Sequence, residues 1–267
     1  MADVALHPPV EAGAYEPPFL GAYSKKVGMW LFLLSDSLTF GALLFAYTYG
    51  RLSTPHWPTP FGARSIANAS VMTACLLSSS LTMVLAVLAA RRGDSKWQLN
   101  WILATMFFGT AFVVLHAMEW TGLIHEGLRL PIFPEAKGAA ETAGELAKAT
   151  QAVPQFPATF FGLTGMHMLH VTIGVIYLGV IALRRKFIPI LLGLWLVGWL
   201  MLPATSPFKY GIHVLLFAAV VASIVVWLRP KVYDAHDVEV SGLYWHFVDL
   251  VWMFIFPLVY LMSTKVV

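Results

Sequence analysis

The chain of 267 residues contains seven apolar runs that are each long enough to cross a lipid bilayer as a helix. They lie near residues 27–49, 66–90, 99–123, 157–183, 187–205, 208–228 and 242–263. A crossing needs about 20 residues, because the hydrocarbon core is about 30 Å thick and a helix rises about 1.5 Å per residue. Backbone groups in lipid must be hydrogen-bonded within the protein, so these runs predict helices. We therefore expect an all-α, polytopic membrane bundle of seven helices.

Composition agrees with a membrane protein and defines its polar parts. The chain is 58% hydrophobic and only 12% charged, whereas soluble domains are about 25% charged. Residues 1–26 form a polar N-terminal tail, residues 27–267 form the bundle, and residues 124–156 form a polar loop on its outer side. The proline-rich start lacks the apolar core of a cleavable signal. Cys75 is the only cysteine, so the chain contains no internal disulfide.

The placement of lysine and arginine predicts the orientation. With the N-terminus inside, the inner segments hold ten of these residues and the outer segments hold seven, two of them deep in a long loop. Basic residues favour the cytoplasmic side, so we expect the N-terminus inside and the C-terminus outside. The net charge of +3 then reflects membrane topology, and nothing indicates a nucleic-acid partner.

Histidines and an aspartate stand inside the predicted helices. His246 and Asp249 lie three residues apart, as do His167 and His170, so each pair shares a helix face. An ionisable group within lipid costs a few kcal/mol on insertion scales, and it must face protein, a partner or water. The structural interpretation is a mutual hydrogen bond between His246 and Asp249 that holds the helix in a bundle.

Asp36 is the most informative single residue, because it lies about 14 Å inside the first helix. The hydroxyls of Ser35, Ser37 and Thr39 are close in sequence, and we expect them to hydrogen-bond its carboxyl. A packing carboxyl and a functional one are equally compatible with this position.

Depth separates the buried ionisable groups. His246 and Asp249 are predicted about 6 and 10 Å from the inner end of the last helix. Five groups share the inner half of the membrane, namely Asp36, His167, His170, His246 and Asp249. Glu119 is reached only after about 30 Å of an outward-running helix, so it lies near the outer surface. A single cluster of all these groups is therefore not expected.

A metal or haem site is the rival chemical interpretation. The pairs His116 with Glu119 and His167 with His170 have the spacing at which two ligands share one helix face. A bis-histidine haem between His246 and the 167–170 pair is also compatible with depth. Two-metal carboxylate sites require four carboxylates, whereas the inner group offers two. We therefore favour structural histidines and predict no metal site and no catalytic residue in this chain.

Five segments resemble subunit III of the haem-copper terminal oxidases, which include cytochrome c oxidase and its quinol-oxidising relatives. In chain order the segments are Gly28–Asp36, Asn68–Val71, Phe112–Trp120, Phe160–Gly174 and Glu239–Trp252, and they cover roughly half of the chain. The segment 160–174 contains Thr164-Gly165-Met166-His167-Met168-Leu169-His170-Val171, and the last segment contains Tyr244-Trp245-His246-Phe247-Val248-Asp249. Both histidine motifs are specific to the family.

The resemblance implies an accessory subunit of a complex that reduces oxygen to water and pumps protons. Such a subunit carries no haem or copper, binds phospholipid in a helical cleft, and supports proton uptake and the stability of the catalytic subunit. Its partners are subunit I, subunit II and a small subunit IV, in an energy-transducing membrane such as the bacterial cytoplasmic membrane. The resemblance places Asp36, His167, His170, Glu239, His246 and Asp249 at the lipid cleft and subunit interface, and it leaves Glu119 without a role.

The chain also departs from the family pattern. Two helices that precede Gly28–Asp36 in mitochondrial-type chains are absent, and the pair at 187–228 has no counterpart. Asp36 stands where the family usually has glutamate, which is one methylene longer. Three alternatives remain open at this stage: a subunit III relative of nitric oxide reductases, a membrane haem or metal protein, and a transporter.

Overall fold

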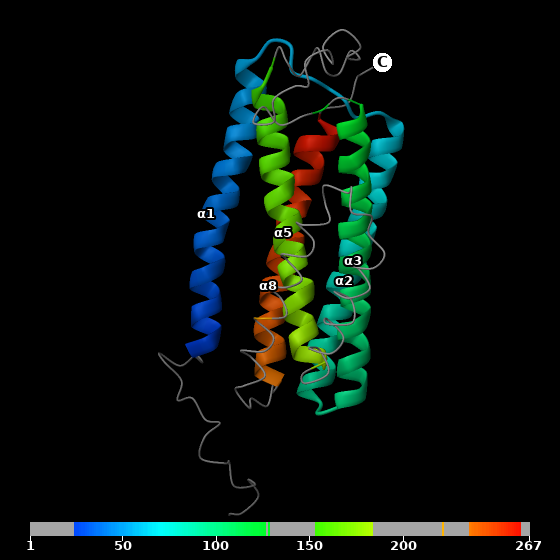
Figure 1. Cartoon of the computed structure of the whole chain (residues 1–267). Helices are drawn as coiled ribbons and strands as arrows, with labels where there is room; N and C mark the ends of the chain where they lie inside the picture. The colour runs from blue at the N-terminus through cyan, green and yellow to red at the C-terminus, as the bar shows by residue number, and fades with distance from the viewer. Residues whose placement is uncertain (1–23, 127, 129–152, 184–220, 222–234, 263–267) are drawn as a thin grey trace, which may run out of the picture.

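Five long helices make up the part of the chain that the structure describes (Figure 1). The structure is a computed structural model, and it describes residues 24–126, 128, 153–183, 221 and 235–262. The helices are α1 (Ser24–Ser53), α2 (Ala63–Arg91), α3 (Ser95–His125), α5 (Gln155–Leu183) and α8 (Ala235–Ile255). A single π-helical segment, η2 (Phe256–Leu261), continues α8. Each of the five helices is long and apolar enough to span a membrane.

The predicted all-helical membrane bundle is therefore confirmed for five of the seven apolar runs. The predicted helices at 187–205 and 208–228, the tail before residue 24 and most of the 124–156 loop lie outside the described residues. The end of α5 and the start of α8 lie at the same end of the bundle (Figure 1).

The last helix begins earlier than the sequence predicted. α8 starts at Ala235, seven residues before the expected start at 242, and the helical course ends at Leu261. Asp237 and Glu239 lie in its first turns, where they form ion pairs with lysines of α1. His246 and Asp249 therefore lie about 16 and 21 Å into the helix, so the shallower depths predicted for them are wrong.

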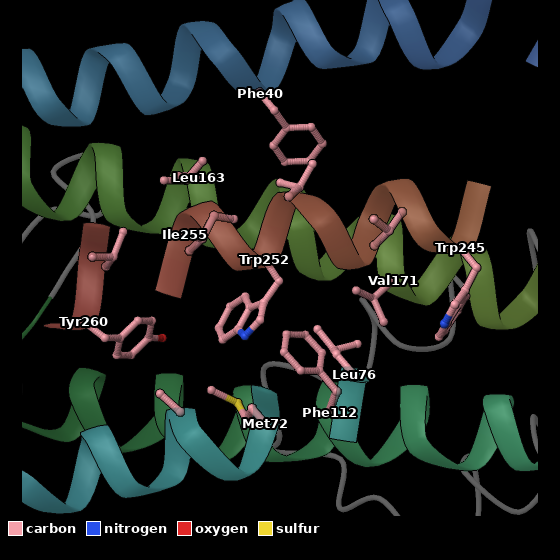
Figure 2. Close-up of a cluster of buried hydrophobic side chains, with 14 of the residues drawn as sticks. Phe40, Met72, Leu76, Phe112, Leu163, Val171, Trp245, Trp252, Ile255 and Tyr260 are labelled. Atoms are coloured by element: carbon pink, nitrogen blue, oxygen red, sulfur yellow. The ribbon is translucent and has the colours of Figure 1, made fainter. Parts of the chain in front are cut away.

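The helices pack around α8. α8 contacts α1, α2 and α5, while α3 packs against α2 and α5. α2 and α3 form a hairpin through a tight turn at Arg92 to Asp94, in which Gly93 adopts a positive φ of 74° and Asp94 caps α3 by accepting the Trp97 N–H. Between the helices lies a core of large side chains that includes Trp245, Trp252, Tyr260, Phe112 and Phe40 (Figure 2).

Glycines make room for the tryptophans of this core. A Cβ on Gly109 of α3 would lie 2.4 Å from the ring of Trp245, and a Cβ on Gly174 of α5 would lie 2.9 Å from the same ring. The Trp245 indole thus fills the space that two glycines leave between α3 and α5. Gly165 is related in the same way to Trp120, at 2.8 Å.

Candidate functional site

Asp36 of α1 pairs with His170 of α5 at the middle of the bundle. The Oδ1 atom of Asp36 lies 3.3 Å from Nε2 of His170, and each side chain retains only 11% of its exposure. The ring of Phe40 covers His170 at a centroid distance of 5.1 Å. The sequence placed both residues in the inner half of the membrane, but it did not pair them, because they belong to helices far apart in the chain.

The other nitrogen of His170 defines the proton arrangement of this pair. Nδ1 lies 2.8 Å from the carbonyl oxygen of Met166, and a carbonyl oxygen only accepts, so Nδ1 carries a proton. The contact between Nε2 and the Asp36 carboxyl then holds one further proton, on either the nitrogen or the oxygen. In both arrangements the pair carries no net charge, which suits a position inside a bilayer.

The hydroxyls near Asp36 do not hydrogen-bond its carboxyl. Ser35 and Ser37 donate to the carbonyls of Phe32 and Leu34, and Thr39 donates to the carbonyl of Ser35. The predicted hydrogen bonds from these hydroxyls to Asp36 are therefore wrong. Short hydroxyl side chains in helices find a carbonyl one turn earlier, and this local bond competes successfully with a side-chain acceptor.

His246 and Asp249 meet α2 rather than each other. The hydroxyl of Ser80 lies 2.7 Å from Nδ1 of His246, and it also hydrogen-bonds the carboxyl of Asp249. The predicted mutual bond between His246 and Asp249 is therefore wrong. A hydroxyl has one proton and two lone pairs, so Ser80 donates to one of these two side chains and accepts from the other.

Two tryptophans of α8 add further bonds to the same face of α2. The indole N–H of Trp245 donates to Ser79 over 2.9 Å, and that of Trp252 donates to Thr73 over 2.9 Å. The sequence analysis missed these residues as polar partners. The signal that points to them is the recurrence of hydroxyl residues along α2 together with the two tryptophans of the last motif.

Glu119 lies in a separate place near the other end of the bundle. Its Oε2 atom accepts a hydrogen bond from the hydroxyl of Tyr260 over 2.9 Å. This contact joins α3 to η2. Within the described residues, no hydrogen bond or ion pair joins Glu119 to the Asp36–His170 pair or to Asp249.

Glu239 lies in an ion-pair network at the start of α8. Its Oε1 atom is 2.7 Å from Nζ of Lys26 and 3.2 Å from Nη2 of Arg91, and Lys25 pairs with Asp237 over 3.1 Å. These contacts join the starts of α1 and α8 to the end of α2. Each is partly exposed, so we expect a modest contribution from each pair, about 0–1 kcal/mol.

His167 is fully buried in an aromatic environment. Its ring stacks on Trp252 at a centroid distance of 5.3 Å and meets the Phe112 ring edge-on at 5.6 Å. Neither ring nitrogen has a hydrogen-bond partner in the described part of the chain. His167 therefore belongs to the core of the bundle.

The described residues do not bring together the three or more ligands of a protein metal site. Within the described residues, no three histidine, cysteine, aspartate or glutamate side chains gather as they would around a metal ion. Both nitrogens of His170 are engaged, one by Asp36 and one by the Met166 carbonyl. The i, i+3 spacing of the histidines is thus used for contacts in the bundle.

Comparison with known proteins gives relatives along most of the chain. It is 27% identical to cytochrome c oxidase subunit 3 of Alkalihalophilus pseudofirmus, over 90% of this chain and 87% of that protein. It is 29% identical to quinol oxidase subunit 3 of Bacillus subtilis, over 89% and 86% of the two chains. It is 26% identical to cytochrome bo(3) ubiquinol oxidase subunit 3 of Pseudomonas aeruginosa, over 88% and 84%. No family model matches the chain.

Proposed function

Because the chain belongs to the subunit III family of haem-copper oxidases, we propose that it is an accessory subunit of a proton-pumping respiratory oxidase. The observation that carries the proposal is the similarity to oxidase subunits 3 over about nine tenths of the chain. Five apolar helices and bacterial relatives agree with a multi-pass protein of a bacterial membrane. The chemistry of oxygen reduction then belongs to partner subunits, and this chain holds no redox centre.

The surface of α1 supports a role in contacts with lipid and with the catalytic subunit. Among the described helices, α1 packs mainly against α5 and α8. Its remaining surface exposes a row of large apolar side chains, namely Trp30, Leu31, Leu34, Leu38, Phe45 and Tyr49. In a bilayer such a surface faces acyl chains or another membrane subunit. We assign it to phospholipid and to subunit I, with subunit II and a small subunit IV as further partners of the complex.

The Asp36–His170 pair is the candidate for the supporting role in proton uptake. It is the part of the proposed site in which a carboxyl and an imidazole share a proton across two helices. Asp36 supplies the acid that the family places beside the lipid cleft. His246 and Asp249, bonded to Ser80, hold α8 against α2 behind it.

Copurification tests the proposal. The chain is tagged and purified from its native membrane in mild detergent, and the expected result is a complex that contains a haem-bearing subunit and consumes oxygen. When the subunits are separated, the visible absorption bands are expected to stay with the partner. Isolation of this chain alone, with stoichiometric iron or copper bound to it, would show that the proposal is wrong.

A further inference from the structure

A group of buried polar atoms between α3 and α5 has no hydrogen-bond partner among the residues that the structure describes. It consists of both ring nitrogens of His116, both ring nitrogens of His167, Oε1 of Glu119 and Nε1 of Trp120. Both histidines are fully buried. Buried polar atoms in folded proteins are almost always hydrogen-bonded, so a concentration of exceptions at one place requires a cause.

The two histidines surround the same two rings. Phe112 lies 5.5 Å from His116 and 5.6 Å from His167, measured between ring centroids. Trp252 lies 5.7 Å and 5.3 Å from the same two imidazoles. The imidazoles of α3 and α5 therefore contact the same two aromatic rings.

An aromatic face satisfies the N–H donor of an imidazole but not its acceptor nitrogen. A neutral imidazole has one N–H donor and one acceptor nitrogen. The face of an aromatic ring is negative, so it attracts an N–H but repels a nitrogen lone pair. The nearly perpendicular Phe112 and His167 rings fit such an N–H contact. Each histidine still requires a donor for its second nitrogen.

Water has the chemistry that this group lacks. Each molecule offers two donors and two acceptors, so water complements imidazole nitrogens, the Trp120 N–H and a Glu119 oxygen alike. We propose that His116, His167, Trp120 and Glu119 form an internal water-binding site between α3 and α5, in which ordered water bridges the two imidazoles. Through the Tyr260 hydroxyl on Glu119, the site connects to η2. The inference is independent of the oxidase role.

The first test compares the thermal denaturation of the purified complex with and without the imidazoles. His116→Leu and His167→Leu are each expected to lower the denaturation midpoint, by about 3 °C, because each change leaves the bridging water and the opposite histidine short of a partner. The double variant is expected to fall by clearly less than the sum, since both changes remove the same water bridge. Thr164→Val is the matched control. Thr164 is equally buried one turn before His167 and bonds only a carbonyl of its own helix, so little change is expected.

A rise of the midpoint in either leucine variant would overturn the proposal, because it would mean that the imidazoles are unpaired in a dry core. Additive effects of the two changes would also overturn it. If the variants fail to assemble, a high-resolution density map of the unaltered complex decides. Density for water within hydrogen-bonding distance of both histidines supports the site, and a continuous apolar contact between the rings in that map refutes it.

Discussion

At the scale of single residues, the pair of Asp36 and His170 joins α1 to α5 through one contact between side chains. Asp36→Ala leaves the Nε2 atom of His170 buried without a partner, so we expect a loss of about 1–3 kcal/mol in stability. In the purified oxidase this is expected to appear as a lower denaturation midpoint and faster loss of activity during turnover. Haem content, measured by absorption, is expected to stay unchanged.

Ser37→Ala is the control for this change. Ser37 is exposed beside Asp36 and donates to a carbonyl of its own helix, so its removal is expected to leave both readouts unaltered. Loss of haem from the complex in Asp36→Ala would contradict the role proposed for Asp36, because it would place the residue in support of a redox centre.

The Ser80 hydroxyl gives a second residue-scale prediction. His246→Ala and Ser80→Ala each break the contact between α8 and α2, so both are expected to lower phospholipid retention during purification while haem content stays constant. The double variant is expected to resemble Ser80→Ala, since that change already removes the bond to His246. Phospholipid is measured as phosphorus per haem. Independent, additive losses would show that His246 acts through another contact.

Residue types were predictable here, while their partners were not. The motifs identified Asp36, His170, His246 and Asp249 as the buried polar residues of the inner half. The partners come from other helices, as Ser80 does, and local sequence contains no information on which helices become neighbours. The mistaken partners, Ser35 for Asp36 and Asp249 for His246, were those close in sequence.

Among the helices, the close approach of the Trp245 ring of α8 to α3 depends on the lack of a side chain at Gly109. Gly109→Ala places a methyl group 2.4 Å from the buried ring of Trp245, so the ring or a helix must move. We expect a loss of about 1–3 kcal/mol in stability, as for other overpacked cores. Gly122→Ala on the same helix meets open space and is expected to be neutral or to gain up to about 1 kcal/mol. Thermal denaturation of the two complexes checks this, and equal midpoints would contradict it.

Arg51 connects the C-terminal end of α1 to η2. Its guanidinium donates to the carbonyls of Leu258 and Met262, at the C-terminal end of η2. A cation at a helix C-terminus satisfies free carbonyls and the helix dipole, so Arg51→Leu is expected to cost about 1 kcal/mol. Arg64→Leu is the control, because Arg64 is exposed at the start of α2. A comparison of protease sensitivity of α1 in the two variants measures this; equal digestion rates would contradict it.

Helix boundaries were predictable where the charged residues lie outside the apolar run. The predicted helices at 27–49, 66–90, 99–123 and 157–183 all lie within helices of the structure. The start of α8 was missed because Asp237 and Glu239 suggested a segment outside the membrane. In the fold their charges are matched by Lys25 and Lys26 of α1, so the helix continues through them.

For the molecule as a whole, the topology of the segment between α5 and α8 gives the last prediction. Because α5 ends where α8 starts, this segment leaves and returns at one side of the membrane. Its two apolar runs are long enough for a pair of crossings, as the sequence predicts. In a Cys75→Ala background, Ser206→Cys lies between the two runs and is expected to react with a membrane-impermeant maleimide from the outer side. His56→Cys, in the connection from α1 to α2, is the outer control, and Arg92→Cys is the inner control. Labelling of position 206 only from the inner side, in parallel with position 92, would show that the pair does not cross and that the bundle has five helices.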